Sequence, residues 1–342
     1  MTYLILYLIL AILCLWGIQF KSTDMDISEI MNRMNRLRVI VAVILIFGHC
    51  TIPYDPRPLI ILPFRKASTF CVGYFFILSG YGLAYSVSTK PNYLNNFWKK
   101  IINLVWLTVF ASVVSTLIQN IALGTWEPIR LINWYMPAIT VLYLVFYVVY
   151  RLFPDSKAKR IIWLSVAVFA LIAAVCCYGN LVDRNYRNYF ISELAFPFGV
   201  FIYEFSDSLS TFLKRKGSIL LIVLTAILFN GAALIVPELG LLDLIFHNLM
   251  LIPTALLVIW ILDKLSISNY ILKKGFRYTM FLYLFQFPIL NILKSYYLSI
   301  NRPFDIFYFL GCLSLTCILA FALQFVYDSV GAMIHRHFQT KS

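Results

Sequence analysis

Long apolar runs recur along nearly the whole chain, and short polar or basic stretches separate them. A helix that crosses the hydrocarbon core of a bilayer needs about 20 consecutive, predominantly apolar residues. Eleven segments meet this requirement: 2–20, 37–54, 67–88, 101–123, 134–153, 161–179, 189–205, 217–236, 241–262, 277–297 and 304–330. The pattern therefore predicts an all-α fold, a polytopic membrane bundle of about eleven transmembrane helices.

Two of the eleven segments differ from the others. Glu193 and Pro197 interrupt segment 189–205, which makes it the weakest of the predicted spans. Segment 2–20 has no basic stretch before it and no small-residue cleavage site before Lys21, features that a secretory signal peptide would have. We therefore predict that this first segment is an uncleaved anchor.

The composition agrees with a membrane protein and excludes several other classes. Of the 342 residues, 61% are hydrophobic and 13% are charged, and the mean hydropathy is +0.84. A soluble domain has about 45–50% apolar and about 25% charged residues, and a soluble globule has no interior that could bury so much apolar surface. A soluble enzyme, a disordered chain and a nucleic-acid-binding module are therefore excluded, and the lipid bilayer is the expected environment.

The basic surplus indicates how the chain lies in the membrane. The 28 Lys and Arg residues outnumber the 15 Asp and Glu residues, giving a net charge of +13. In polytopic proteins such a surplus reflects basic loops on the cytoplasmic side. With the N-terminus outside, 20 of the 28 basic residues fall in cytoplasmic segments and 8 in outer ones. The chain is therefore predicted to lie in the cell membrane with an outer N-terminus and a cytoplasmic C-terminus.

Arg38 and His49 are two of the few charged or titratable residues in or beside a predicted span. Such groups are functional candidates because lipid penalises them. Arg38 begins the second span, and His49 follows eleven residues later, close to three helical turns. Both side chains therefore share one helix face, about 16 Å apart along its axis. Histidine exchanges protons near neutral pH, and the arginine fork binds oxyanions. The alternative is a snorkelling arginine and a histidine in one interhelical hydrogen bond.

A second set of polar groups lies toward the outer side of the predicted bundle. Asp243 and His247 are four residues apart and share a helix face, so the carboxylate can orient the imidazole. Together with Glu193 they are candidates for an acceptor site. The alternative for Asp243 and His247 is a hydrogen-bonded pair that holds helices together.

The third predicted span carries the run YFFILSGY at residues 74–81. Phe75 and Ser79 are four residues apart and share a face. Ser79 and Gly80 form a notch of small residues that lets another helix approach closely. Taken alone, this run indicates helix packing rather than chemistry.

Together, these two spans resemble the paired signature of the acyltransferase-3 family of integral membrane acyltransferases. The family has R-x10-H on one span and FFxxSG on the next. This chain has Arg38 and His49 on one span and Phe75–Gly80 on the next. Weaker similarities follow at residues 97–100, 133–137, 196–199 and 278–284. The resemblance covers about residues 33–330 and implies a ten-span core with an extra N-terminal span.

The resemblance also suggests how the chain is divided. Residues 1–32 are expected to hold the anchor span and a cytoplasmic loop, and residues 33–334 the membrane acyltransferase domain. Residues 335–342 are expected to form a short cytoplasmic tail.

The resemblance implies an O-acyltransferase that moves an acyl group, commonly acetyl, from cytoplasmic acyl-CoA to a hydroxyl. The acceptor would be a cell-envelope polysaccharide, another glycan or a lipid-linked sugar. Acetyl-CoA is then the expected co-substrate, with no bound cofactor and no nucleic acid. No metal site is expected either, since the seven cysteines form no C-x-x-C pair.

The family pattern also implies roles for individual residues. His49 would be the general base, and Arg38 would be catalytic and would handle the donor together with Lys99 and Lys100. The residues expected to line the site belong to the motifs and to their weaker echoes: Phe75, Phe76, Ser79, Gly80, Tyr81 and Trp134.

Three positions depart from the family pattern. Asn35 stands where the family often has Asp, Lys99–Lys100 where arginines are common, and Gln286 at the place of a histidine.

Two other function classes also stay open. One is a transporter or exporter of a glycan or lipid-linked sugar, although no inverted repeat typical of transporters is evident. The other is a structural subunit of a polysaccharide-export machine, in which His49 would be inert.

Overall fold

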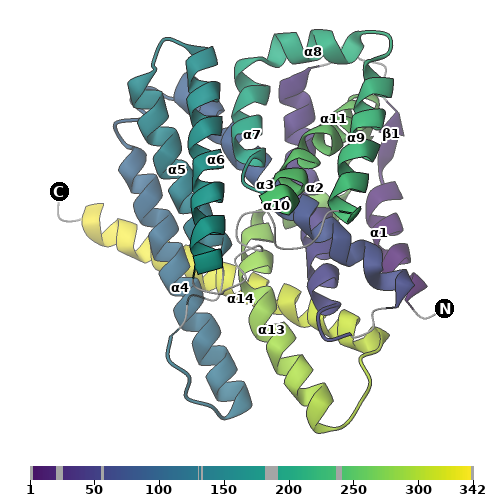
Figure 1. Ribbon diagram of the computed structural model, residues 1–342. Coiled ribbons are helices and arrows are strands. Elements are labelled where there is room, and N and C mark those ends of the chain that lie inside the picture. The colour runs from purple at the N-terminus through teal and green to yellow at the C-terminus, as the bar shows by residue number, and fades with distance from the viewer. Residues whose placement is uncertain are drawn as a thin grey trace.

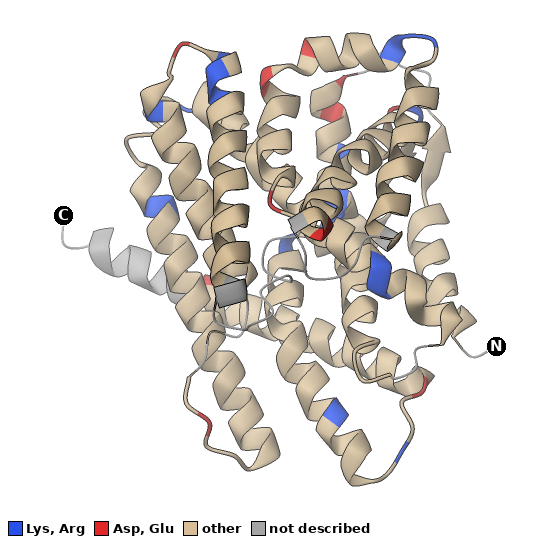
Figure 2. Ribbon diagram, in the orientation of Figure 1, with Lys and Arg blue, Asp and Glu red and all other residues tan. Residues whose placement is uncertain are grey.

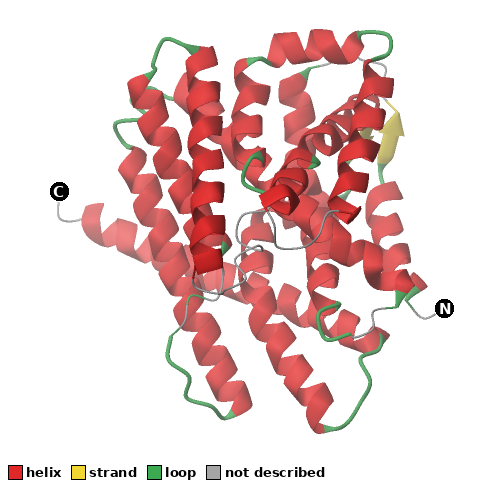
Figure 3. Ribbon diagram, viewed as in Figure 1, coloured by secondary structure: helices red, strands yellow, loops and turns green. Residues whose placement is uncertain are grey.

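The computed structural model of the chain is built almost wholly from helices (Figures 1 and 3). It describes residues 3–20, 26–54, 58–129, 131, 134–181, 192–235 and 241–339. The helices are α1 (Leu4–Leu15), α2 (Ile27–Cys50), η1 (Leu59–Ile61), α3 (Leu62–Thr89), α4 (Phe97–Leu123), α5 (Tyr135–Leu152), α6 (Lys157–Leu181), α7 (Ala195–Glu204), α8 (Ser206–Lys214), α9 (Ser218–Ile235), α10 (Leu241–Leu249), α11 (Leu251–Lys264), α12 (Tyr270–Gly275), η3 (Phe276–Tyr278), α13 (Thr279–Ser299) and α14 (Ile306–Gln339). For the described part of the chain, the prediction of an all-α fold is confirmed.

Six helices are long and apolar enough to cross a membrane, or seven if the bent pair α8 and α9 counts as one span. The six are Leu59–Thr89, Phe97–Leu123, Tyr135–Leu152, Lys157–Tyr178, Leu242–Lys264 and Ile306–Ser329. The chain is therefore a multi-pass membrane protein by these candidate spans. Figure 2 shows the same property, since α6 carries no Lys or Arg beyond its first turn.

The other predicted spans fall short of this standard for three physical reasons. Helices α1 and α7 have 12 and 10 residues, and even 12 residues rise only about 18 Å. Helix α2 has 24 residues but carries Arg33, Arg36 and Arg38 in its first half. Helix α13 has 21 residues and includes Gln286 and Lys294, which lower its apolar character. Among the described residues, length and composition alone thus identify six or seven of the eleven predicted spans.

Helices α3 and α7 pack against each other through glycines. A Cβ atom on Gly80 would collide with the backbone oxygen of Phe196, and one on Gly199 would lie 2.8 Å from the carbonyl carbon of Ile77. The two helices run in the same direction, because Ser192 before α7 donates to the Thr69 backbone oxygen in the first part of α3, and Tyr203 near the end of α7 packs against Tyr85 near the end of α3. The predicted close approach of a helix at this notch is confirmed at Gly80, and α7 is the helix that enters it.

The first helix is tied to the segment that leads into α13. After α1, the short strand β1 (Ile18–Phe20) pairs antiparallel with β2 (Leu265–Ile267). The Asn269 amide donates to the backbone oxygens of Leu13 and Trp16, each at 3.0 Å. The N-terminal element therefore braces the connection that begins after α11 and ends at η3 and α13.

Candidate active site

A cavity of about 320 Å³ opens between α2, α3, α4, α5 and the start of α13. Its lining consists of Asn35, Arg38, Phe75, Leu78, Ser79, Gly82, Leu83, Ser86, Lys100, Tyr135, Tyr143, Thr279, Met280 and Tyr283. The cavity thus brings together the arginine of R-x10-H, two residues of FFxxSG and one lysine of the basic pair.

Helical spacing explains why α3 and α5 contribute so much of this lining. On α3, Phe75, Ser79 and Ser86 recur at intervals of four and seven residues, which places them on one face. On α5, Tyr135 and Tyr143 are eight residues apart and also share a face. Ser79 lines the same cavity as both tyrosines, so the two helix faces meet there.

The cavity carries positive charge. The Arg38 Nε donates to the backbone oxygen of Asn35 at 3.2 Å, and its guanidinium carbon lies 5.7 Å from the ring centre of Phe276. The Lys100 ammonium lies 5.9 Å from the ring centre of Tyr143. Among the described residues, no Asp or Glu belongs to the lining. Two cations without a carboxylate favour an anionic ligand such as a phosphate.

Aromatic rings line the cavity at the end nearest His49. The Tyr283 ring lies 4.9 Å from that of Tyr135 and 6.2 Å from that of Phe75, measured between centroids. Tyr283 belongs to α13 and is the last residue of that helix that lines the cavity. We call these three residues the aromatic end of the cavity.

His49 lies beyond this aromatic end and is not part of the lining. Its Nδ1 is 2.9 Å from Oε1 of Gln286, and its ring centre is 4.7 Å from that of Phe287. Gln286 follows Tyr283 by three residues, a rise of about 4.5 Å along α13. His49 contacts α13 and Arg38 contacts η3 directly before it, so both side chains of α2 face the same neighbouring segment. The predicted shared face of Arg38 and His49 is confirmed.

Other residues expected at the site lie outside the cavity lining: Phe76, Gly80, Tyr81, Lys99 and Trp134. Phe76 stacks on Tyr135 at 4.9 Å and so supports the lining from behind. Trp134 meets the same Tyr135 edge-on at 6.4 Å. Tyr81 packs against Tyr203 of α7, and Lys99 is exposed in the first turn of α4.

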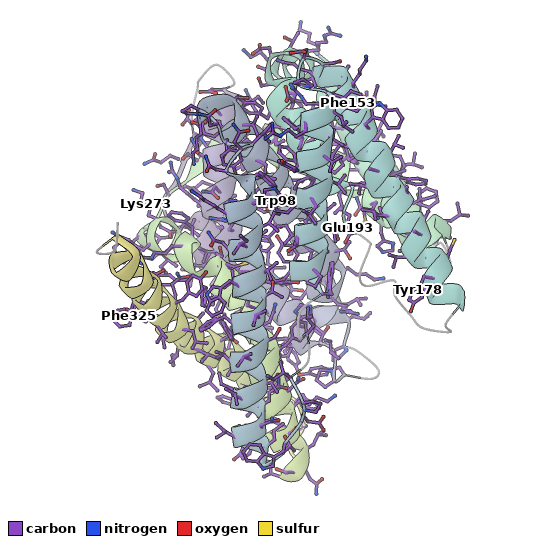
Figure 4. All side chains as sticks on the ribbon, turned by 90° about the vertical axis from the view of Figure 1, so that its left-hand side faces the viewer. Trp98, Phe153, Tyr178, Glu193, Lys273 and Phe325 are labelled. Atoms are coloured by element: carbon purple, nitrogen blue, oxygen red, sulfur yellow. The ribbon has the colours of Figure 1, made fainter. Side chains whose placement is uncertain are left out.

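The outer candidates form a separate buried group. The His247 Nδ1 lies 2.9 Å from a carboxylate oxygen of Asp243, which is 0% exposed. Glu193 is 1% exposed, and its Oε2 accepts from the backbone nitrogen of Ser192 at 3.0 Å. Figure 4 labels Glu193 at mid-height of the bundle, between the levels of Phe153 and Tyr178. None of these three candidates lines the cavity.

The backbone nitrogen of Leu194, next to Glu193, donates to Asn248, next to His247, at 3.0 Å. This contact joins the beginning of α7 to α10. The structure therefore brings Glu193 near the Asp243–His247 pair at one junction of the fold.

Several lining residues were not predicted, although their spacing gave a signal. Asn35 lies three residues before Arg38, Ser86 lies seven after Ser79, and each pair shares a helix face. Thr279, Met280 and Tyr283 gave only the weak similarity at residues 278–284. Their place in the cavity depends on α13 lying beside α2.

Comparison with known proteins gives one clear assignment. A family model described as an acyltransferase domain, that of the acyltransferase-3 family, matches residues 31–324. No curated protein and no solved structure matches the chain significantly. The matched range contains Arg38, His49, Gln286 and every residue that lines the cavity. The chain therefore belongs to the acyltransferase-3 family of membrane acyltransferases.

Proposed function

We propose that the chain transfers an acyl group, most simply acetyl, from cytoplasmic acyl-CoA to a hydroxyl of a cell-envelope glycan or lipid-linked sugar. The observation that supports this proposal is the cavity in which Arg38 and Lys100 meet Ser79 of the FFxxSG motif. Membership of an acyltransferase family supports the acyl-transfer part of this proposal. The choice of donor and acceptor is our own inference.

The donor fits the charge and shape of the cavity. Acyl-CoA carries several phosphate groups, and Arg38 and Lys100 provide cations with no carboxylate beside them in the lining. Lys99 adds exposed positive charge next to Lys100. A volume of about 320 Å³ suits the thin acyl end of the donor rather than the whole molecule. The acyl end would therefore point toward the aromatic end of the cavity.

His49 is proposed as the general base on the far side of the aromatic end. The acceptor oxygen attacks the thioester carbonyl carbon while His49 takes the hydroxyl proton. The carbon–sulfur bond then breaks, and the CoA thiolate takes the proton from His49 and leaves as the free thiol. Donor and acceptor approach from opposite sides of Phe75, Tyr135 and Tyr283, so these rings must let the thioester carbonyl reach His49. Glu193, Asp243 and His247 are proposed to contact the acceptor on the outer side.

The first test measures donor use by Arg38→Lys. Purified protein in proteoliposomes is given acyl-CoA with a labelled acyl group and a cell-envelope fraction as acceptor. Arg38→Lys keeps the charge but loses the planar fork. We expect the KM for acyl-CoA to rise about tenfold, the effect of losing about 1.4 kcal/mol of donor binding.

The control for this test is Lys273→Ala, which removes an exposed lysine of α12 that does not line the cavity. It should leave the KM for acyl-CoA at the wild-type value. An Arg38→Lys protein with an unchanged donor KM would contradict the donor site. A wild-type protein that moves the glycan across the bilayer without consuming the thioester would instead establish a transporter.

We also propose that all eleven predicted segments enter the membrane, with the N-terminus outside and the C-terminus inside. The distribution of Lys and Arg, 20 against 8, supports this orientation. The end of α5 with the first turn of α6, and the α8–α9 connection, carry basic residues at the upper end in Figure 2 and would then face the cytoplasm. After Ser342, a reporter that works only in the cytoplasm should be active, and one that works only outside the cell should be inactive. Activity of an externally active reporter at that position would overturn the proposed orientation.

A further inference from the structure

Gln286 is a buried amide that contacts the imidazole of His49. It is 0% exposed. Its Oε1 lies 2.9 Å from Nδ1 of His49, and its Nε2 donates to the backbone oxygen of Tyr283 at 3.0 Å. Both ends of the amide therefore have a partner.

The contact with Tyr283 determines which way the amide points. A backbone carbonyl oxygen can only accept a hydrogen bond, so the group that faces it must be the NH₂ of Gln286. The amide oxygen must then face His49, and an amide oxygen can only accept. Nδ1 of His49 must therefore carry the proton of the shared hydrogen bond.

This assignment decides which ring nitrogen can act as a base. In a neutral imidazole only one nitrogen carries a hydrogen, and the other has the free electron pair. With Nδ1 protonated, Nε2 is the nitrogen that can take a proton from a hydroxyl. The ring of Phe287 lies 4.7 Å away and packs against the same imidazole, so two successive residues of α13 hold it.

We propose that Gln286 is a positioning residue for acyl transfer: it holds the His49 proton on Nδ1 and presents Nε2 to the acceptor hydroxyl. This inference rests on the proposed function, in which His49 is the general base. Gln286 acts only through His49 and is not among the residues that line the donor cavity.

The direct test observes the His49 tautomer by nitrogen NMR of the full-length protein in lipid bilayers, with ring-¹⁵N-labelled histidine. The chain has only four histidines, so the His49 signals are identified by their loss in His49→Asn. At a pH where the ring is neutral, we expect Nδ1 to give the signal of a protonated nitrogen and Nε2 that of an unprotonated one. A wild-type His49 protonated on Nε2 would overturn the inference, whatever the activity of the protein.

The kinetic test uses Gln286→Leu, which removes the acceptor for Nδ1. We expect kcat to fall about tenfold or more, but less than on removal of the base itself. The KM values for donor and acceptor should stay unchanged, and the His49 signals should move toward the Nε2-protonated form. Gln286→Glu keeps an acceptor oxygen and should retain more of the wild-type kcat than Gln286→Leu.

The matched control is Asn291→Leu, since Asn291 is an amide on the same helix that donates to Gln119 on the protein surface. It should leave both the tautomer and kcat at wild-type values. If Gln286→Leu changes the tautomer but not kcat, the proposed general-base role of His49 fails, while the hydrogen-bond assignment stands. If kcat falls without any change of tautomer, the positioning role is wrong. Should Gln286→Leu fail to fold, the kcat of Gln286→Glu and the His49 tautomer in the wild-type spectrum still test the positioning role.

Discussion

Replacement of His49 by alanine is expected to lower acyl transfer about 10²-fold or more, the usual contribution of a general base. The folding of the His49→Ala protein should be almost unaffected. The side chain makes one hydrogen bond to Gln286, and such bonds between membrane helices average about 0.6 kcal/mol. The measurements are the rate of labelled acyl transfer in proteoliposomes and the elution profile of the solubilised protein. The profile should match that of the wild type.

A matched variant is His247→Ala, which removes a buried histidine paired with Asp243 and outside the cavity lining. Its loss of acyl transfer should be clearly smaller. Gln286→His should not restore activity to His49→Ala, because the new ring would start from α13 rather than from α2. Near-normal transfer by His49→Ala would contradict the mechanism and would make the Asp243–His247 pair the next candidate for the base.

The apolar pattern predicts the long spans well and the short elements poorly. Segment 134–153 was predicted where α5 runs from Tyr135 to Leu152, and segment 101–123 lies within α4. Segment 241–262 matches the candidate span Leu242–Lys264, although α10 ends at Leu249 and α11 begins at Leu251. In contrast, segment 189–205 contains only the ten-residue α7 among the described residues. Hydropathy reports which residues avoid water. It does not distinguish contact with lipid from contact with protein, and it cannot locate a break within an apolar run.

The site could be predicted along each helix but not between helices. The eleven-residue spacing places Arg38 and His49 on one face of α2 through helix geometry alone. The contact of His49 with Gln286, and the place of Tyr283 in the cavity, require the register of α2 against α13. No property of either segment alone determines that register. For the same reason, the motif could not show that Phe75 and Ser79 reach the cavity while Phe76 and Tyr81 do not.

Replacement of Gly80 by alanine is expected to destabilise the protein strongly, although it adds a single methyl group. A Cβ atom there would collide with the Phe196 oxygen and would lie 3.1 Å from its carbonyl carbon and 3.2 Å from the Val200 nitrogen. All three atoms belong to the backbone of α7, so no side chain can rotate away and the two helices must separate. Overpacking of this kind costs about 1–3 kcal/mol or more. The yield of monodisperse protein and its thermal unfolding midpoint should both fall well below the wild-type values.

The same loss should follow from Gly199→Ala, which introduces the collision from the α7 side against the Ile77 carbonyl. The control is Gly231→Ala in α9, where nothing lies within 4 Å of the new methyl group and the unfolding midpoint should stay at or above the wild-type value. A Gly80→Ala protein that unfolds at the wild-type temperature would contradict the close crossing. Successive residues of a helix point about 100° apart. Within FFxxSG, Ser79 can therefore face the cavity while Gly80 receives α7, so one short motif both forms the site and packs the helix that supports it.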